Sequence, residues 1–216
     1  MLWELAGRLA WPGGALVYRG PKERKALALT FDDGPSESTP ELLELLARYG
    51  VGATFFQCGM HVRRLPDIAR AVAEASHEIG NHSDSHRSML FCSPRIMYEE
   101  LNSAQETIFA ITGVRSRLFR PPYGYLWFGL SGVTRQLGLT GVMWTTIGWD
   151  WTHDARRVHA ILRNGCQNGA IFCLHDGRGT ETKPDIANTL EAVRRFIPEA
   201  LDQGFRFETV SQLLRH

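Results

Sequence analysis

The sequence predicts an α/β protein whose parallel strands form a distorted, incomplete (β/α)7 barrel. Three observations support this prediction. Short runs rich in β-branched and aromatic residues alternate with longer amphipathic stretches, and the alternation repeats seven times. The length of 216 residues also suits one barrel, a fold that commonly needs about 200–250 residues. Right-handed connections allow either a wrapped barrel or an open doubly wound sheet, and we favour the barrel.

Seven segments have the composition of buried strands. Each holds mainly apolar residues, and turn residues or the start of a helical pattern bound it. In chain order the expected strands are residues 26–31, 53–57, 77–81, 116–120, 140–147, 169–175 and 205–210.

The segments between these strands have helical patterns. In residues 39–50 four leucines share one face, Thr39 and Pro40 suit a helix start, and Gly50 suits its end. Helices of this kind would cover the faces of a parallel sheet. The other expected helices are residues 65–75, 93–113, 154–165 and 183–204.

Composition and charge indicate an ordinary globular protein. We expect one domain over residues 1–216, with residues 1–24 as an N-terminal extension. The 24 basic and 23 acidic residues nearly cancel and are scattered, which argues against a nucleic-acid partner. No apolar run approaches the about 20 residues of a membrane span. Glu4 and Arg8 interrupt the one candidate signal region, so the sequence shows no export signal.

Two further patterns concern the N-terminal extension and the cysteines. Leu2, Leu5 and Leu9 at helical spacing predict a short amphipathic helix that packs on the rest of the domain rather than on a membrane. The four cysteines have neither CxxC nor zinc-finger spacing, and three lie in apolar runs typical of buried thiols. No pattern sets the oligomeric state.

Polar residues gather where the expected strands end. In (β/α) barrels the active site forms at these ends, so residues far apart in the chain are expected to converge. These residues are Asp32 and Asp33 after the first strand, His82 and His86 after the third, Arg120 and Tyr123 after the fourth, Asp150 and Trp151 after the fifth, and His175 at the end of the sixth.

A metal site is the simplest chemistry for part of this set. His82 and His86 are four residues apart, which places both imidazoles on one side of a compact turn. One carboxylate would complete a two-histidine, one-carboxylate set with positions open to water and substrate, and Asp33 is the nearest candidate. Asp32 would then be free to act as the base that deprotonates the attacking water. The alternative interpretation is a plain Asp-Gly-Pro turn and two surface histidines.

Five ordered motifs resemble those of one enzyme family. TFDDGP, HEIGNHSDSH, RPPYG, the Asp150–Trp151 pair and CLHD are similar to the motifs of the polysaccharide deacetylases of the NodB-homology group, carbohydrate esterase family 4. The resemblance spans residues 25–215. It implies a distorted barrel that uses zinc, cobalt or another divalent metal to remove N-acetyl or O-acetyl groups. It also implies an acetylated chitin-type, peptidoglycan or xylan sugar as the substrate, and a place in the cell envelope or outside the cell if a leader was removed.

The resemblance implies roles for the metal and base residues. Asp33, His82 and His86 correspond to the metal ligands, and Asp32 corresponds to the general base. Arg120 corresponds to the arginine that pairs with the base carboxylate. For the ligands and the base, this assignment agrees with the interpretation from the residues alone.

The resemblance also implies residues for the leaving group and the substrate. His175 would protonate the leaving nitrogen or oxygen, with Asp150 orienting its imidazole. The backbone N–H of Tyr123 would stabilise the oxyanion. The expected substrate contacts are Tyr123, Trp151 and Leu174, with Tyr125, Trp127 and Trp149 as further aromatic residues that either stack on sugars or belong to the barrel core.

The sequence departs from the family pattern at three positions, one of which, Arg87 in place of a frequent proline after His86, is a loop difference. Ile147 stands where an aspartate is common, and Cys173 stands where a leucine is common, so the walls of the acetyl pocket differ. Two other functions stay open: a carbohydrate-binding protein that holds a metal without catalysis, and a metal-assisted amidohydrolase acting on a non-sugar amide. The presence of both a candidate base and a candidate acid favours an enzyme.

Overall fold

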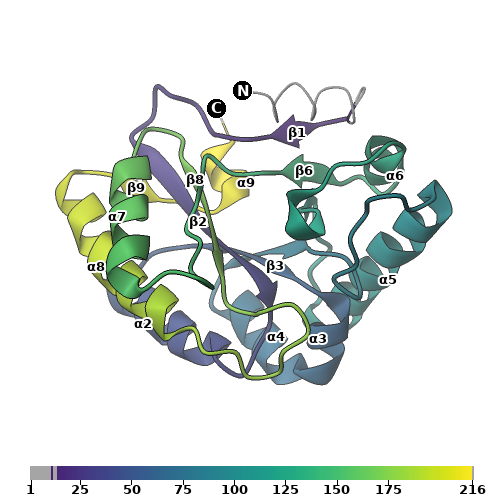
Figure 1. Ribbon diagram of the computed structural model, residues 1–216, viewed down its shortest axis with the longest axis horizontal. Coiled ribbons are helices and arrows are strands. Elements are labelled where there is room, and N and C mark those ends of the chain that lie inside the picture. Colours follow the sequence, from purple (N-terminus) through teal and green to yellow (C-terminus); the bar gives the residue numbers. More distant parts are fainter. Residues whose placement is uncertain (1–10, 12–13, 216) are drawn as a thin grey trace.

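The computed structural model describes residue 11 and residues 14–215 (Figure 1). The expected helix with Leu2, Leu5 and Leu9 lies outside the described residues. Figure 1 shows a curled sheet in the middle of the molecule and helices around its outer side. Within the described part of the chain, no helix is long and apolar enough to cross a membrane.

All strand pairs in the structure are parallel. The sheet is open and follows the order β1-β6-β5-β4-β3-β2-β8-β7, with β9 paired to β2 at its amino end. This architecture confirms the α/β class and is consistent with a distorted, incomplete barrel. The strands are β1 (Leu16–Val17), β2 (Ala26–Gly34), β3 (Thr54–Gln57), β4 (Glu78–Asn81), β5 (Leu118–Phe119), β6 (Thr140–Val142), β7 (Thr146–Ile147), β8 (Ile171–His175) and β9 (Arg206–Phe207).

The helices follow the strands closely in chain order. They include the five expected segments and several short helices that the sequence did not predict, among them those over residues 59–64, 130–136 and 210–213. The helices are α2 (Thr39–Tyr49), α3 (Gly59–Arg64), α4 (Pro66–Glu74), α5 (Pro94–Thr112), the 3-10 turn η1 (Pro122–Gly124), α6 (Leu130–Gln136), α7 (Ala155–Gly165), α8 (Ala187–Asp202) and α9 (Val210–Leu213).

The expected strand over residues 140–147 is two strands instead of one. β6 pairs with β1 and β5, whereas β7 pairs with β8 at the opposite end of the strand order. The backbone N–H of Met143 bonds to Val17 and that of Thr145 bonds to Ile171, so the chain changes partners between these two residues. This crossing connects the two ends of the curled sheet, and the barrel stays incomplete because no strand pair among the described residues joins those ends.

The alternation of side chains along β2 and β8 positions the site. Leu27, Leu29 and Phe31 point to one face of β2, where they pack in the core shared with α2 and α8. Thr30 and Asp32 therefore point to the other face, inside the curled sheet. All nine residues of β2 are buried, so this strand carries its carboxylates on a rigid support.

Candidate functional site

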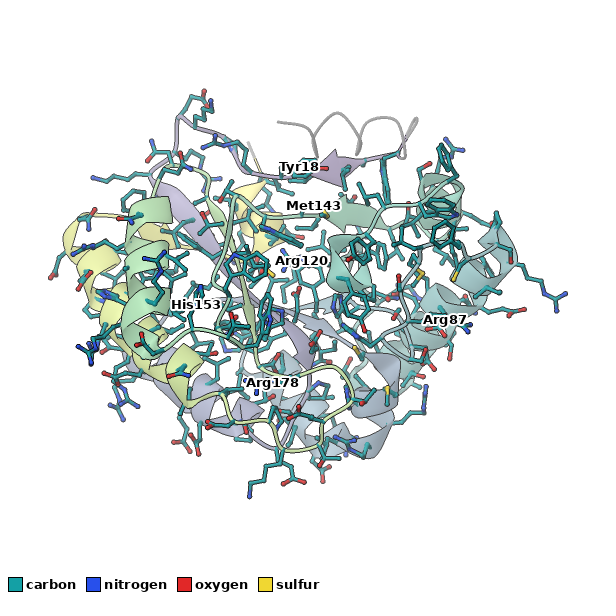
Figure 2. All side chains as sticks on the ribbon, viewed as in Figure 1. Tyr18, Arg87, Arg120, Met143, His153 and Arg178 are labelled. Carbon is teal, nitrogen blue, oxygen red and sulfur yellow. The ribbon has the colours of Figure 1, made fainter. Side chains whose placement is uncertain are left out.

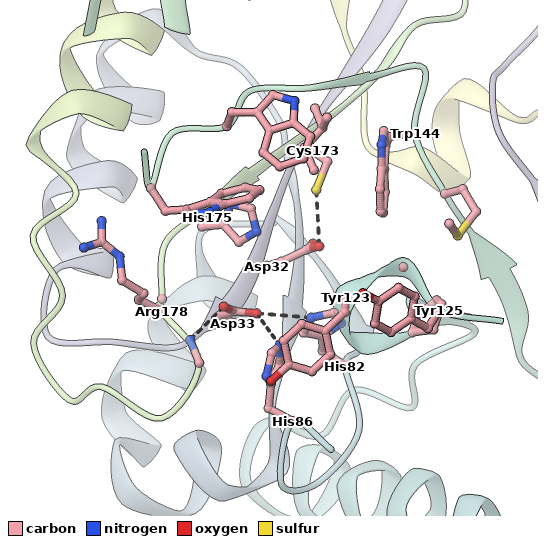
Figure 3. Close-up of a pocket in the computed structure, with 18 residues that line it drawn as sticks. Asp32, Asp33, His82, His86, Tyr123, Tyr125, Trp144, Cys173, His175 and Arg178 are labelled. Atoms are coloured by element: carbon pink, nitrogen blue, oxygen red, sulfur yellow. Dashed lines mark hydrogen bonds and ion pairs between the residues drawn. The ribbon is translucent and has the colours of Figure 1, made fainter. Parts of the chain in front are cut away.

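A pocket of about 750 Å³ opens at the carboxyl ends of the strands (Figure 3). This volume lies within the range of about 300–1,000 Å³ that is usual for small-molecule sites. Of the predicted residues, Asp32, Asp33, His82, His86, Tyr123, Trp151 and His175 line it.

Three predicted residues do not line the pocket. Arg120 and Asp150 are buried and act from behind its wall through hydrogen bonds described below. Leu174 is fully buried in the hydrophobic core. The prediction that Leu174 contacts substrate is therefore wrong, because alternation along β8 turns Cys173 and His175 into the pocket and Leu174 away from it.

Asp33, His82 and His86 meet at one point. The Oδ1 atom of Asp33 lies 2.9 Å from Nε2 of His86 and 3.2 Å from Nε2 of His82. All three side chains are buried at the pocket floor, and they form a group able to hold a metal ion. Figure 3 shows the two contacts of Asp33.

The hydrogen bonding of His82 shows that this group suits a cation. Its Nδ1 atom donates to the backbone carbonyl of Arg120 at 2.8 Å, so a neutral ring would turn the lone pair of Nε2 toward the Asp33 carboxylate, whereas a protonated ring donates to it. Two acceptors that face each other are stabilised by a cation between them, and a histidine held through its second nitrogen is typical of metal ligands. The donor set therefore fits a divalent metal.

The charge state of Asp33 agrees with this use. Burial by itself raises the pKa of Asp33, but the hydrogen bonds and charges of His82 and His86 outweigh it and hold the pKa well below its usual value. A third hydrogen bond comes from the backbone N–H of Gly179 to Asp33 Oδ2, at 2.8 Å. Asp33 is therefore an ionised carboxylate, as a metal ligand must be.

The backbone at Asp33 explains how two neighbouring aspartates face one pocket. Successive residues of a regular strand point to opposite faces. Asp33 has φ of 70°, and the pairing of β2 with β3 shifts register between Asp32 and Gly34. Positive φ also occurs at His86 and Tyr123. Such conformations are costly for residues other than glycine and cluster at functional sites.

A buried ion pair holds Asp32. Arg120 has no exposed surface, and its Nη1 atom donates to Asp32 Oδ1 at 2.7 Å. Its Nε and Nη2 atoms donate to the carbonyls of Val142 and Met143, at 3.1 and 3.0 Å, and its guanidinium lies 4.2 Å from the ring centre of Phe56. Figure 2 shows Arg120 in the interior of the molecule. The carboxylate of Asp32 is thus fixed in orientation, with Oδ2 left toward the pocket.

Replacing Arg120 with methionine is expected to lower the free energy of unfolding by about 3–5 kcal/mol, because Asp32 would then be a buried charge without a partner. Urea denaturation of the metal-free protein measures this loss. The double variant Arg120→Met/Asp32→Asn should recover part of it, since the unpaired charge is gone. A loss below about 1 kcal/mol in the single variant would show that water or another cation replaces Arg120.

Asp150 holds His175 in a defined orientation. Nδ1 of His175 donates to Asp150 Oδ1 at 2.9 Å, and the backbone N–H of His175 donates to Oδ2 at the same distance. Thr189 donates a further hydrogen bond to Oδ2 at 2.7 Å. Burial lowers the pKa of His175, but the charge and hydrogen bond of Asp150 outweigh burial and raise the pKa to about 9. The imidazole is therefore protonated at neutral pH, with Nε2 available to the pocket.

Aromatic side chains form the upper walls of the pocket. The rings of Tyr123 and Tyr125 stack at 6.0 Å, those of Trp149 and Trp151 lie 5.0 Å apart, and all four residues are exposed by more than a third. Exposed aromatic faces of this kind suit stacking on sugar rings. Trp127 instead packs in a separate apolar cluster away from the pocket.

Sequence reasoning missed a second layer of polar residues behind the site. Nε2 of His61 donates to the carbonyl of Gly179 at 2.7 Å, and Gly179 in turn donates to Asp33. The buried Asp176 accepts from Thr39 at 2.6 Å. Asp176 could have been suspected from its place beside His175 in the CLHD motif. His61 gives no sequence signal, because it acts through the backbone of a loop 118 residues away.

Comparison with known protein families and sequences agrees with the geometry. The polysaccharide deacetylase family profile matches residues 19–142. The chain is 33% identical over 215 residues to a peptidoglycan-N-acetylglucosamine deacetylase of Bacillus cereus, covering 95% of both. It is 31% identical to a chitooligosaccharide deacetylase of Bradyrhizobium, covering 88% of this chain and 90% of the relative. It is 34% identical to PgdA of Listeria monocytogenes, a peptidoglycan-N-acetylglucosamine deacetylase, but spans only 42% of that protein.

Solved structures of similar proteins include active and inactive examples. A family 4 carbohydrate esterase of Streptomyces lividans, in complex with acetate, superposes with a TM-score of 0.77 at 32% identity, covering 84% of this chain and 91% of that one. BA3943 of Bacillus anthracis, described as a pseudoenzyme, superposes with a TM-score of 0.86 at 27% identity, covering 94% and 70%. Because a pseudoenzyme has the same fold, the fold does not distinguish an active enzyme from an inactive one. An argument about activity must therefore rest on the side chains of the site.

Proposed function

We propose that this chain, which belongs to the polysaccharide deacetylase family, is a metal-dependent hydrolase that removes acetyl groups from N-acetylglucosamine units of peptidoglycan or chitooligosaccharides. One observation carries the proposal. A candidate base, a candidate acid and a candidate metal-ligand set line one pocket whose walls are aromatic. The substrate class comes from the relatives, and the pocket chemistry is compatible with it.

Asp33, His82 and His86 are the proposed ligands, and zinc is the proposed ion. One carboxylate and two imidazoles suit zinc, although cobalt accepts the same donors. A divalent ion held there would polarise the acetyl carbonyl and lower the pKa of the attacking water. The Nδ1 bond of His82 and the Gly179 bond of Asp33 keep both ligands aimed at the shared point.

The other residues divide the proton transfers between them. Asp32, fixed by Arg120, takes a proton from the attacking water through Oδ2, the oxygen that Arg120 does not hold. His175, which Asp150 keeps protonated, gives its Nε2 proton to the departing sugar nitrogen. The backbone N–H of Tyr123, at the pocket rim, donates to the oxyanion.

Acetate release tests the proposed function. The full chain is stripped of metal, zinc or cobalt is added back, and acetate is measured with peptidoglycan, acetylated chitooligosaccharides and acetylated xylan as substrates. Metal-dependent release from the first two supports the proposal. Tight binding of these glycans without acetate release would favour the carbohydrate-binding protein, and release only from a non-sugar amide would favour the amidohydrolase.

Asp32→Asn is expected to keep the metal and lose about 10²–10⁴ in kcat, because an amide cannot accept the proton of water. Metal content and acetate release, measured on the same sample, check this. The asparagine has nearly the same shape, so substrate binding should change little. Near-normal kcat in this variant would require a different base.

His61→Leu is expected to weaken metal binding about 10- to 100-fold, because the loop that donates to Asp33 loses its anchor at Gly179. Competition with a chelator measures the affinity. His61→Gln should recover part of the loss, since its amide can donate to the same carbonyl. His159→Leu, which removes a pair with Glu199 on the outer helices, is the control. Equal affinity in His61→Leu and the control would remove His61 from this role.

A further inference from the structure

Cys173 is a pocket residue to which the proposed mechanism gives no role. It lies on β8, is almost fully buried, and places Sγ 3.4 Å from Oδ2 of Asp32. His175 follows two residues later on the same face of β8 and is paired in register with Asp32 on β2. Figure 3 shows Cys173 and His175 on the opposite side of Asp32 from the Asp33–His82–His86 group.

These three side chains form a second group of metal donors. A carboxylate oxygen, a sulfur and an imidazole nitrogen lie within 4.8 Å of one another, separate from the first group. Arg120 occupies only Oδ1 of Asp32, and Asp150 occupies only Nδ1 of the His175 ring. Nε2 therefore remains for an ion, as does Oδ2 once the Cys173 thiol that donates to it is deprotonated. Cysteine, histidine and aspartate are the usual protein ligands of zinc, and a thiolate also favours cadmium.

We propose that Asp32, Cys173 and His175 form a second, inhibitory site for a thiophilic divalent cation such as zinc or cadmium. On binding, the Cys173 thiol and the His175 Nε2 each release a proton to solvent, and their lone pairs bind the ion. The pocket supplies room for a fourth ligand from solvent.

Local charge makes this site the weaker of the two. The guanidinium of Arg120 lies 2.7 Å from Asp32, and an ion on Asp33, one residue away, repels a second dication. The second site should therefore fill only after the first. An ion bound there occupies the lone pairs of both the proposed base, Asp32, and the proposed acid, His175. The inhibition of acetate release therefore rests on the proposed function, whereas the binding of the ion does not.

Cobalt titration of the metal-stripped, reduced full chain tests the binding. The Asp33–His82–His86 group has only oxygen and nitrogen donors, so a near-ultraviolet thiolate-to-cobalt charge-transfer band distinguishes the second group from the first. We expect the band to grow with the second equivalent of cobalt and to be lost in Cys173→Ser, which still binds the first equivalent. Cys166→Ser, with its half-buried thiol outside the pocket, is the matched control and should keep the band. Cys173→Ala serves if the serine variant melts early.

Absence of the band in the wild-type chain, or its persistence in both Cys173 variants, would overturn the proposal. Acetate release measured at increasing zinc tests the inhibition. In the wild-type chain, activity should rise with the first equivalent of zinc and fall with excess zinc. In Cys173→Ser, activity should rise to its own maximum in the same way but should not fall with excess zinc. Excess zinc that inhibits both proteins equally would overturn the inhibitory role. A charge-transfer band in a chain that releases no acetate would leave the second site intact and contradict the proposed function instead.

Discussion

Alanine at His82, His86 or Asp33 is expected to abolish bound metal and acetate release together. Asp33 lies within 3.2 Å of both imidazoles, and a site with only three protein ligands has little redundancy. The ion is expected to supply several kcal/mol of barrier lowering, so its loss should reduce kcat about 10³-fold or more.

Metal content per chain and acetate release, measured on the same preparations, check this result. His159→Ala serves as the control for removing a histidine, since its partner Glu199 lies outside the pocket. Full metal occupancy in any two of the three variants would contradict the ligand assignment.

The sequence predicted the approximate places of the candidate metal-ligand residues because they follow the ends of parallel strands, where a barrel brings distant residues together. It did not predict how both Asp32 and Asp33 reach the pocket. Regular alternation would turn one of them away, and the register shift after Asp32 depends on pairing with β3. That pairing is a tertiary contact, which a local pattern does not contain.

Two errors have the same origin. Residues 140–147 read as one apolar strand, but the chain changes partners between β6 and β7 because it connects opposite ends of the sheet. Leu174 lies in a motif and was assigned to substrate, whereas alternation along β8 places it in the core. The neighbouring Cys173 departs from the family pattern, which predicted a change in the pocket wall, and the structure places Cys173 in the pocket lining. Once it is known which face of the sheet one side chain on a strand points to, the faces of its neighbours follow from the alternation.

Asp150→Asn is expected to lower kcat while the metal remains bound. Asp150 accepts from both Nδ1 and the backbone N–H of His175, so it fixes the tautomer and favours the protonated imidazole. A general acid typically contributes about 10²–10⁴ in rate, and the loss should approach that of His175→Ala. The double variant should be little worse than either single one, because the two residues act as a unit.

The pH dependence separates this role from a merely structural one. His175 has a pKa of about 9, raised by Asp150 against the effect of burial, so the protonated acid is present at neutral pH and is lost as pH rises through that value. Removing the negative charge makes the imidazolium easier to deprotonate, and the alkaline limb of the kcat profile should move to lower pH. Thr189→Val removes one hydrogen bond to Asp150 but keeps its charge, so that limb should move less. If Asp150→Asn keeps a normal kcat and an unchanged alkaline limb, His175 is not the acid that Asp150 supports, and the leaving group takes its proton from another donor.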